Sequence, residues 1–212
     1  MIAGLILAAG RSARLGRSKQ LLPLDGVPIL EHVLRRAARS RLDQIVLVLG
    51  HDAPAIEAAV EDHGQRVVIN ADYAAGQSTS LRAGLRAIDP NAAAVLVLLG
   101  DQPEIDPTAI DAVIDAYQRG CGSIVRPTYQ GERGHPVLFD RALFPELAEM
   151  TGDAGARRLL REHRDDVYEV AISRSRLPPD VDTEEDYAAL LARWETLAGC
   201  GPARQRSWRE AC

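Results

Sequence analysis

The sequence predicts a single α/β domain whose centre is a doubly wound, mostly parallel β-sheet. At 212 residues the chain is long enough for one sizeable domain and short for two. Short apolar runs alternate with amphipathic segments of helical period as far as about residue 125, which is the pattern of repeated β-α-β units. The apolar runs are nearly continuous, as in parallel strands that helices cover on both faces.

The first half of the chain supplies most of the predicted sheet. Its predicted strands are rich in Val, Ile, Leu and Ala, and they cover residues 5–7, 45–49, 67–69 and 94–99. Its predicted helices carry apolar residues on one face, and they cover residues 29–38, 53–63 and about 77–88. Asp25-Gly26, before the first helix, predicts a turn.

The second half is less regular. Asp106-Pro107 begins a predicted helix, and Thr183 with Asp186 has the spacing of a capping box at the start of the last one. Other helices are predicted over residues 141–149 and 154–163, and strands over 123–125, 137–139 and 167–170. Apolar periodicity fades near residue 199, so the predicted domain covers residues 1–198, and residues 199–212 are expected to form a loosely ordered tail.

Composition narrows the class of protein. The net charge of −5 gives no electrostatic footprint for nucleic acid or for an anionic membrane. No apolar run approaches the roughly 20 residues of a membrane span, and the N-terminus lacks the basic start of a signal peptide. The three cysteines have no metal-binding or CxxC spacing, which favours reduced thiols. We therefore expect a cytoplasmic protein that binds neither nucleic acid nor membranes.

The loop after the first predicted strand has the composition of a phosphate-binding site. Gly10 and Gly16 allow backbone N–H groups to approach an anion. Three arginines, including Arg14, and Lys19, the only lysine in the chain, supply the countercharge. The glycine spacing does not match a Walker loop, and the G-x-G-x-x-G fingerprint of NAD enzymes is absent. The alternative is a loop that only carries solvated arginines.

Two aspartates are candidate metal ligands. Asp101 directly follows the most apolar strand, at the carboxyl end where open α/β sheets bind ligands. A carboxylate there is costly unless it holds a cation or accepts hydrogen bonds, so we predict Mg²⁺ coordination, with a turn or helix cap as the alternative. Asp182 is the predicted second ligand and Asp180 the alternative to it, although capping of the last helix competes for Asp182.

Other polar residues are candidates for contact with a substrate. Gln77, Ser78 and Ser80 open a predicted helix, where N–H groups favour an anion or the edge of a base, with ordinary helix capping as the alternative. His135, between a glycine and a proline before a predicted strand, is a candidate substrate contact or an exposed turn residue. His51 and His63 are interpreted as surface residues.

A cationic glycine loop and two strand-end aspartates suit attack on the α-phosphorus of a nucleoside triphosphate. Lys19 and Arg14 would neutralise the phosphates, and Mg²⁺ on Asp101 and Asp182 would polarise the α-phosphate and hold pyrophosphate as the leaving group. Positioning and charge stabilisation are expected to carry this reaction, so Arg14, Lys19 and Asp101 are the predicted catalytic residues and no protein nucleophile is required.

The chain resembles the MobA-like nucleotidyltransferases, which have a Rossmann-like fold of the nucleotide-diphospho-sugar transferase type. The resemblance rests on LILAAGRSARLGRSKQLLPLDGVPIL, GQSTSLRAGL, VLLGDQP, GHPVLF and DVDTEEDY, in that order between about residues 2 and 191. It implies that Asp101 binds Mg²⁺ and that the nucleotide loop contains Leu7, Ala8, Ala9, Gly10, Arg14 and Lys19. Leu15, where the family often has Met, is a volume-conserving change.

The motifs together most resemble the molybdenum cofactor cytidylyltransferase branch. Its members join CMP from CTP to the terminal phosphate of molybdopterin and release pyrophosphate, and a molybdoenzyme that receives the product is an implied partner. Alternatives are a related enzyme that uses GTP or a sugar or polyol phosphate, and a non-catalytic protein that delivers the cofactor. The missing dinucleotide fingerprint disfavours an NAD-dependent oxidoreductase.

Overall fold

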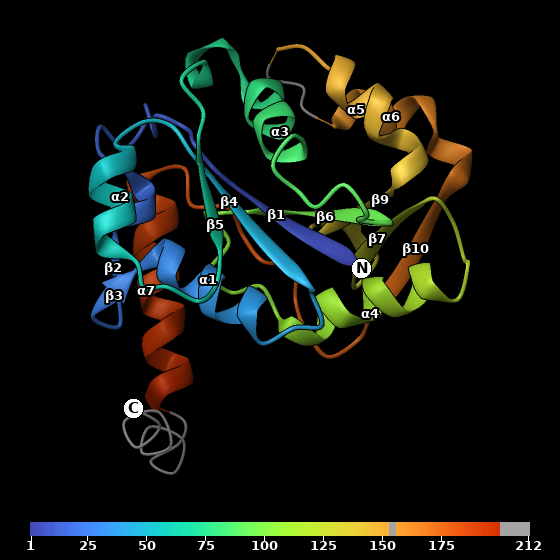
Figure 1. Ribbon diagram of the computed structural model, residues 1–212. Helices are drawn as coiled ribbons and strands as arrows, with labels where there is room; N and C mark the ends of the chain where they lie inside the picture. The colour runs from blue at the N-terminus through green and yellow to red at the C-terminus, as the bar shows by residue number, and fades with distance from the viewer. Residues whose placement is uncertain (153–155, 200–212) are drawn as a thin grey trace.

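Within the residues that the structure describes, 1–152 and 156–199, a computed structural model shows an eight-stranded mixed sheet at the centre of the molecule (Figure 1). In spatial order the strands are β10 (Val167–Ile172), β7 (Ile124–Tyr129), β9 (Val137–Asp140), β6 (Ala94–Leu99), β1 (Ile2–Ala8), β4 (Gln44–Leu49) and β5 (Arg66–Ile69), and β8 (Glu132–Arg133) pairs with β7. A separate hairpin of β2 (Pro23–Leu24) and β3 (Val27–Pro28) encloses the predicted Asp25-Gly26 turn.

Helices cover both faces of the sheet. α1 (Ile29–Ala38) and α4 (Pro107–Gln118) lie on one face, and α3 (Gln77–Leu85), α5 (Phe144–Glu149) and α6 (Arg157–Glu162) lie on the other (Figure 1). α2 (Ala53–Ala59) and α7 (Glu184–Gly199) lie beside α1. Along β1, Leu5 packs towards α3 and its neighbour Ile6 towards α1, so both faces of the strand are apolar. This explains the uninterrupted apolar run of its sequence.

The predicted mostly parallel α/β sheet is confirmed, with one difference in its second half. β9 lies antiparallel between β6 and β7. The chain reverses after β7 through Gln130 and Gly131, both at positive φ, and forms the antiparallel β7–β8 pair before it enters β9. No helix separates β7 from β9 along the described chain, so the right-handed crossover needed for a parallel neighbour is missing.

Several predicted boundaries shift. α2 ends at Ala59 and α3 at Leu85, several residues before the predicted ends, because turns follow each helix. The predicted helix over 141–149 begins with a 3-10 turn, and residues 154 and 155 of the next one lie outside the described residues. The same is true of residues 200–212 of the predicted tail, whereas Gly199 belongs to α7. Cys121 is a free thiol.

α7 packs against the segment that follows β1. Leu190 and Val181 form a small buried cluster with Leu15, Leu22 and Ile29. The predicted capping box is confirmed at the start of this helix, because the side chains of Thr183 and Asp186 each accept a hydrogen bond from the other residue's backbone N–H. The docking of α7 therefore fixes the polar turn before it against the loop after β1.

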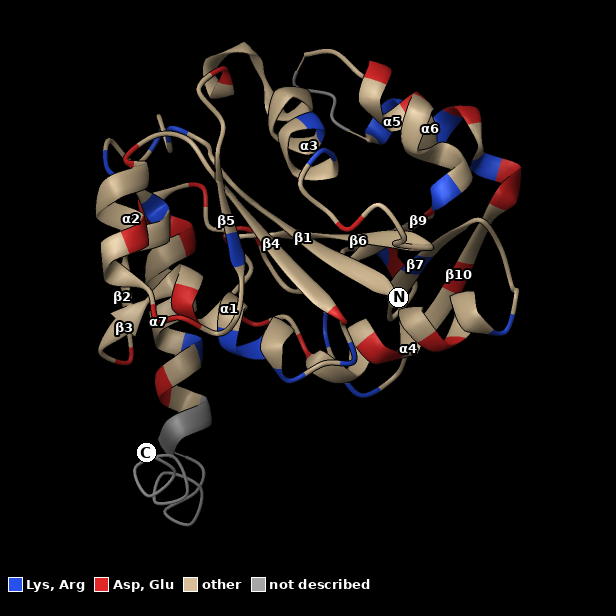
Figure 2. Ribbon diagram, in the orientation of Figure 1, with Lys and Arg blue, Asp and Glu red and all other residues tan. Residues whose placement is uncertain are grey.

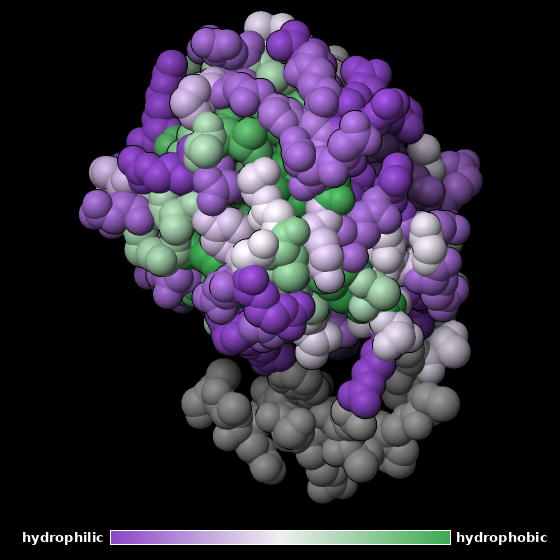
Figure 3. Space-filling model, turned by 90° about the vertical axis from the view of Figure 1, so that its right-hand side faces the viewer, coloured by the Kyte–Doolittle hydropathy of each residue, from purple (hydrophilic) through white to green (hydrophobic). Residues whose placement is uncertain are grey.

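The charged residues lie mainly outside the strands. β1 and β6 are tan along their length, whereas both signs of charge are spread over the helices and loops (Figure 2). On the side of the molecule nearest β10 and α6, hydrophobic side chains are visible in small areas among hydrophilic ones (Figure 3). None of the described helices combines the length and apolar character needed to cross a membrane.

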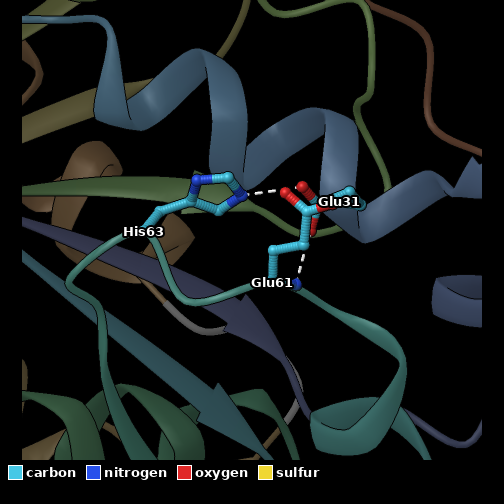
Figure 4. Close-up of side chains that lie close together, drawn as sticks. All are labelled: Glu31, Glu61 and His63. Atoms are coloured by element: carbon cyan, nitrogen blue, oxygen red, sulfur yellow. Dashed lines mark hydrogen bonds and ion pairs between the residues drawn. The ribbon is translucent and has the colours of Figure 1, made fainter. Parts of the chain in front are cut away.

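A buried carboxylate connects α1 with the turn after α2. The Glu31 side chain, 2% exposed, accepts a hydrogen bond from Arg35 at 2.6 Å. It also accepts hydrogen bonds from His63 at 2.7 Å and from the Glu61 N–H at 3.0 Å (Figure 4). His63 is therefore half-buried and bonded, and its interpretation as a surface residue is wrong. Glu31, Glu61 and His63 have the atoms of a metal site, but Arg35 pairs with both glutamates. We assign this cluster a structural role.

Replacing Glu31 with Gln is expected to lower the free energy of unfolding by about 3 kcal/mol at pH 7, because Arg35 and His63 lose a buried countercharge. Burial raises the pKa of Glu31, but the hydrogen bonds from Glu61, His63 and Arg35 outweigh burial and hold it below its usual value. A lowered folded-state pKa stabilises the protein above the unfolded-state value of about 4.3, and this contribution is lost as pH falls through the folded-state pKa.

Urea unfolding of the wild type and Glu31→Gln in steps from pH 7 downwards measures this difference. The gap between the two proteins should close at acidic pH. Glu57→Gln, an exposed position on α2, is the control and should change stability by about 0.5 kcal/mol or less. A gap that persists unchanged at acidic pH contradicts the assigned role of the Glu31 carboxylate.

Candidate active site

The candidate site begins at the end of β1, which lies between two glycines that follow the neighbouring strands. Gly50 follows β4 and Gly100 follows β6, the two strands that flank β1. A Cβ on Gly100 would lie 2.7 Å from the Cβ of Ala8, and one on Gly50 would lie 2.9 Å from the Cβ of Ala9. Both glycines therefore allow the close approach of the three strand ends, and the chain leaves the sheet at Gly10 next to both neighbours.

The loop that follows turns Lys19 inward. Ser12 has a positive φ and its carbonyl accepts hydrogen bonds from the N–H groups of Leu15 and Gly16. Its hydroxyl accepts a hydrogen bond from the Lys19 N–H at 3.1 Å. The buried Gln20 donates its side-chain N–H to the carbonyl of Ala8 at 3.2 Å, which holds the end of the loop against its beginning.

Lys19 joins the two predicted metal ligands. Its Nζ donates a hydrogen bond to Asp101 Oδ2 and another to Asp182 Oδ1, the second at 2.8 Å. The Lys19 and Asp101 side chains are only 15% and 11% exposed, whereas Asp182 is 38% exposed. The loop after β1, the end of β6 and the turn before α7 thus meet at one ammonium group.

This contact shifts the pKa values of all three groups. Burial lowers the pKa of Lys19, but the two carboxylates outweigh burial and hold it above its usual value. The hydrogen bond from Lys19 holds the pKa of Asp182 below its usual value. Burial raises the pKa of Asp101, and Lys19 opposes that rise. A nearby cation therefore favours the ionised form of Asp101.

Arg14 and Asp180 occupy the rim. Arg14, 70% exposed, donates to Asp182 at 3.1 Å and can turn towards a ligand at little cost, because exposed ion pairs contribute little to stability. Asp180 is exposed and accepts a hydrogen bond from Gln102 at 2.7 Å. Asp182, rather than Asp180, shares a cation with Asp101.

The donor set fits a divalent cation. Carboxylate oxygens of Asp101 and Asp182 both reach the same Nζ, so they can converge on one small cation. Oxygen ligands of this kind suit Mg²⁺ and Mn²⁺, which in nucleotide sites take one or two carboxylates together with phosphate oxygens. A metal ion would replace the Lys19 ammonium between them and release it for the phosphates.

A cavity adjoins this cluster on the α3 side of the sheet. Leu7 and Leu99 line it: Leu7 is one of the last two residues of β1, and Leu99 lies directly before the Gly100-Asp101 turn. Gln77 from the first turn of α3 and His135 from the segment before β9 supply polar groups to a lining that is otherwise mostly apolar. The cavity therefore brings together three predicted binding residues: Leu7, Gln77 and His135.

His135 is half-buried, and its interpretation as an exposed turn residue is wrong. Its carbonyl accepts a hydrogen bond from Tyr129 at 2.7 Å, and the bond to Pro136 is cis. Burial lowers the pKa of His135, so the imidazole is neutral at pH 7, and its Nδ1 has no protein partner. A neutral, unpartnered nitrogen beside a cavity is available for a ligand.

The serines of α3 do not cap their helix, which was the alternative to a substrate contact. Gly76 precedes the helix and no side chain caps it, so Gln77 and Ser78 lie within its first turn rather than before it. Ser80 accepts a hydrogen bond from Asn70 at 3.0 Å, which connects α3 to the end of β5. The Ser78 N–H donates to the carbonyl of Gly152 at 3.2 Å, while its hydroxyl is buried without a partner.

Sequence reasoning missed the residues that support the site rather than form it. Ser12 and Gln20 orient Lys19, and Gln102 fixes the turn that carries Asp180. Arg157, which lines the cavity, was also missed. Only Gln102 had a usable signal, because it directly follows Asp101 at a strand end.

Comparison with known proteins assigns the family. The MobA-like NTP transferase domain matches residues 4–167, and the chain belongs to this family. It is 38% identical to the protein in the crystal structure of Rv0371c from Mycobacterium tuberculosis H37Rv, with a TM-score of 0.81 over 90% of this chain and 97% of that one. A second crystal structure of Rv0371c is a complex with manganese, with a TM-score of 0.79. The nucleotide-diphospho-sugar transferase type of fold is confirmed.

The curated relatives differ in the activity that their names give. Nicotine blue oxidoreductase of Paenarthrobacter nicotinovorans is 33% identical over 90% of this chain and 96% of its own length. Purine catabolism protein PucB of Bacillus subtilis is 30% identical over 87% and 93%. Molybdenum cofactor cytidylyltransferase of Escherichia coli is 26% identical over 91% and 97%. All three align with 87% or more of this chain.

Proposed function

We propose that this chain is a divalent-metal-dependent cytidylyltransferase that transfers CMP from CTP to molybdopterin and releases pyrophosphate. The observation that carries the proposal is the contact of Lys19 with both Asp101 and Asp182, next to a glycine loop and a cavity. Membership of the MobA-like NTP transferase family supports nucleotidyl transfer. The relative named molybdenum cofactor cytidylyltransferase supports CTP and molybdopterin as substrates.

The loop residues act on the triphosphate. Ala8, Ala9 and Gly10 present backbone N–H groups where β1 leaves the sheet, and Lys19 and Arg14 neutralise phosphate charge. An oxygen of the acceptor phosphate attacks the α-phosphorus, and the bond from that phosphorus to the bridging oxygen of the β-phosphate breaks. Pyrophosphate carries the electron pair away, so the protein needs only to position the reactants and stabilise charge.

Asp101 and Asp182 would hold a divalent cation, which we propose to be Mg²⁺. A bound cation withdraws charge from the α-phosphate and from the leaving pyrophosphate. Gln77 and the backbone at the start of α3 contact the base, and His135 contacts the acceptor inside the cavity. The reaction is proposed to take place in the cytoplasm, with a molybdoenzyme as the recipient of the product.

Two other functions are favoured by specific observations. The higher identity to the relatives named nicotine blue oxidoreductase and PucB favours an acceptor other than molybdopterin or a redox reaction. The Ala8-Ala9-Gly10 sequence is shared by enzymes that use other nucleotides or sugar phosphates, which favours a wider range of nucleotides and acceptors. The following experiment tests both alternatives.

Pyrophosphate release from CTP and GTP, each with molybdopterin or a sugar 1-phosphate, tests the proposal. We expect release from CTP with molybdopterin, dependent on added Mg²⁺ and abolished by a chelator. Equal use of both nucleotides contradicts the cytidylyl assignment, and release only with the sugar phosphate contradicts the acceptor. Oxidation of NADH or NADPH without pyrophosphate release would move the protein to the redox class.

A further inference from the structure

Two arginines next to the cavity have no acidic partner among the described residues. Arg157, the first residue of α6, lines the cavity and is exposed. Arg126 lies in the middle of β7 and is half-buried. By contrast, Arg133 and Arg158, their neighbours on β8 and α6, pair with Glu169 at 2.6 Å and Glu162 at 3.2 Å.

The strand register places Arg126 on the cavity side of the sheet. Ile124, two residues earlier on β7, pairs with Phe139 of β9, and both belong to the core under α3, α5 and α6. Side chains alternate between the two faces along a strand, so the Arg126 side chain lies on the same face of the sheet as that of Ile124. Phe139 and Val137 on that face line the cavity, which places the Arg126 side chain on the same side as the cavity wall.

The burial of Arg126 leaves part of its guanidinium without a partner. Its Nε is buried and makes no hydrogen bond. Glu169 lies opposite Arg126 on β10, but its carboxylate accepts from Arg133 instead. A buried donor without a protein acceptor is costly, so Arg126 gains if a ligand supplies the acceptor.

Both arginines influence the same half-buried group, His135. Burial lowers the pKa of His135, Asp180 opposes this, and repulsion from Arg126 and Arg157 lowers the pKa further. Arg157 brings positive charge to the otherwise mostly apolar lining of the cavity, and Arg126 adds to it from β7.

We propose that Arg126 and Arg157 bind an anionic group of the acceptor, a carboxylate or a phosphate that is separate from the group attacking the α-phosphorus. That this anion belongs to the acceptor rests on the proposed nucleotidyl transfer. The anion site itself rests only on the two arginines and the cavity. Planar guanidinium groups bind both kinds of oxyanion through paired N–H donors.

The strand positions in the sheet indicate the length of such an acceptor. Val97 of β6 pairs with Val137 of β9, and β7 is the next strand. Arg126 thus lies two strand spacings, roughly 10 Å, to the side of β6 at the level of Val97, and Asp101 follows Val97 by four residues, roughly 13 Å along the strand direction. An acceptor that spans the resulting distance of roughly 16 Å between the two backbone positions, less the reach of the side chains, carries its reactive oxygen at one end and an acidic group near the other.

The test titrates the full chain, without nucleotide, with inorganic phosphate and separately with acetate. The readout is the Nε–Hε NMR signal of each arginine, assigned by single Arg→Lys variants. We expect the Arg126 and Arg157 signals to shift together, with one dissociation constant, for at least one of the two anions. The anion that binds more tightly identifies phosphate or carboxylate as the favoured chemistry.

Substitutions then separate this site from the nucleotide loop. Arg157→Gln is expected to weaken binding reported by Arg126 about tenfold or more, and Arg126→Gln should do the same for Arg157. Arg158→Gln, one residue along α6, should leave binding unchanged. If thermal denaturation shows that Arg126→Gln does not fold, Arg126→Lys and the exposed Arg157→Gln provide the same comparison.

Signals that do not shift with either anion, or that shift with unrelated dissociation constants, overturn the proposal. Loss of both shifts in Arg158→Gln would also overturn it. The result is independent of the proposed function, because no nucleotide is present. A protein that binds the anion here but releases no pyrophosphate would refute nucleotidyl transfer and leave this site standing.

Discussion

Lys19→Ala is expected to lower the rate of pyrophosphate release about 1,000-fold at saturating nucleotide. Lys19 is the one cation of the loop that is held inside the site, where low exposure strengthens its interaction with developing phosphate charge. In the metal-free protein the two carboxylates hold its pKa above the usual value, and phosphate oxygens would supply the countercharge once a metal ion takes the carboxylates, so the ammonium stays charged across the working pH range. The rate should therefore show no loss from deprotonation of Lys19 between pH 7 and about pH 9.

Single-turnover measurements with CTP and the acceptor give this rate directly. Lys19→Met keeps most of the aliphatic side chain and removes only the charge, so it should be as slow as Lys19→Ala if charge is what matters. Arg17→Ala is the matched control, because Arg17 is exposed on the same loop and pairs with Glu184 at 3.0 Å. A Lys19 variant that works at nearly the wild-type rate would show that the loop binds phosphates in another way.

Asp101→Asn is expected to lower turnover about 1,000-fold or more and to weaken divalent-metal binding at least about tenfold. The amide has nearly the same shape but no negative charge, and burial already raises the pKa of Asp101. The fold should be retained, because Lys19 keeps the Asp182 carboxylate as a countercharge at 2.8 Å. Metal binding by the protein alone, measured by Mn²⁺ titration, separates loss of the ion from loss of structure.

The same titration compares the two aspartates of the turn before α7. Asp182→Asn should weaken Mn²⁺ binding, because Asp182 shares a cation with Asp101. Asp180→Asn should change it much less, since the Asp180 carboxylate accepts from Gln102. The reverse order would make Asp180 the second ligand and would assign Asp182 to the loop and the helix cap alone.

The elements that local sequence determines were predicted well. β1 and β6 are continuous apolar runs, and the rule that ligands bind at the carboxyl ends of such strands indicated both the glycine loop and Asp101. The capping box of α7 follows from two residues at a fixed spacing. Each of these features depends on neighbours in the chain and on the period of the pattern.

Features that depend on distant contacts were predicted poorly. β9 is antiparallel because of a reversal at Gln130 and Gly131 that the strand pattern alone does not orient. His63 was assigned to the surface because the sequence does not show that Glu31 lies opposite it. Lys19 was identified, but its support from Ser12 depends on the fold of the loop.

The position of Asp182 near the end of the described chain has a consequence for folding. Lys19 and Asp182 are 163 positions apart in the sequence, whereas the sheet is already complete at Ile172. A growing chain therefore builds its central sheet and both core layers before its reaction centre exists, since domains fold as their segments emerge. Docking of α7 completes the site. A partly synthesised chain can therefore be well folded while it is still unable to hold the nucleotide and the acceptor in position for the reaction.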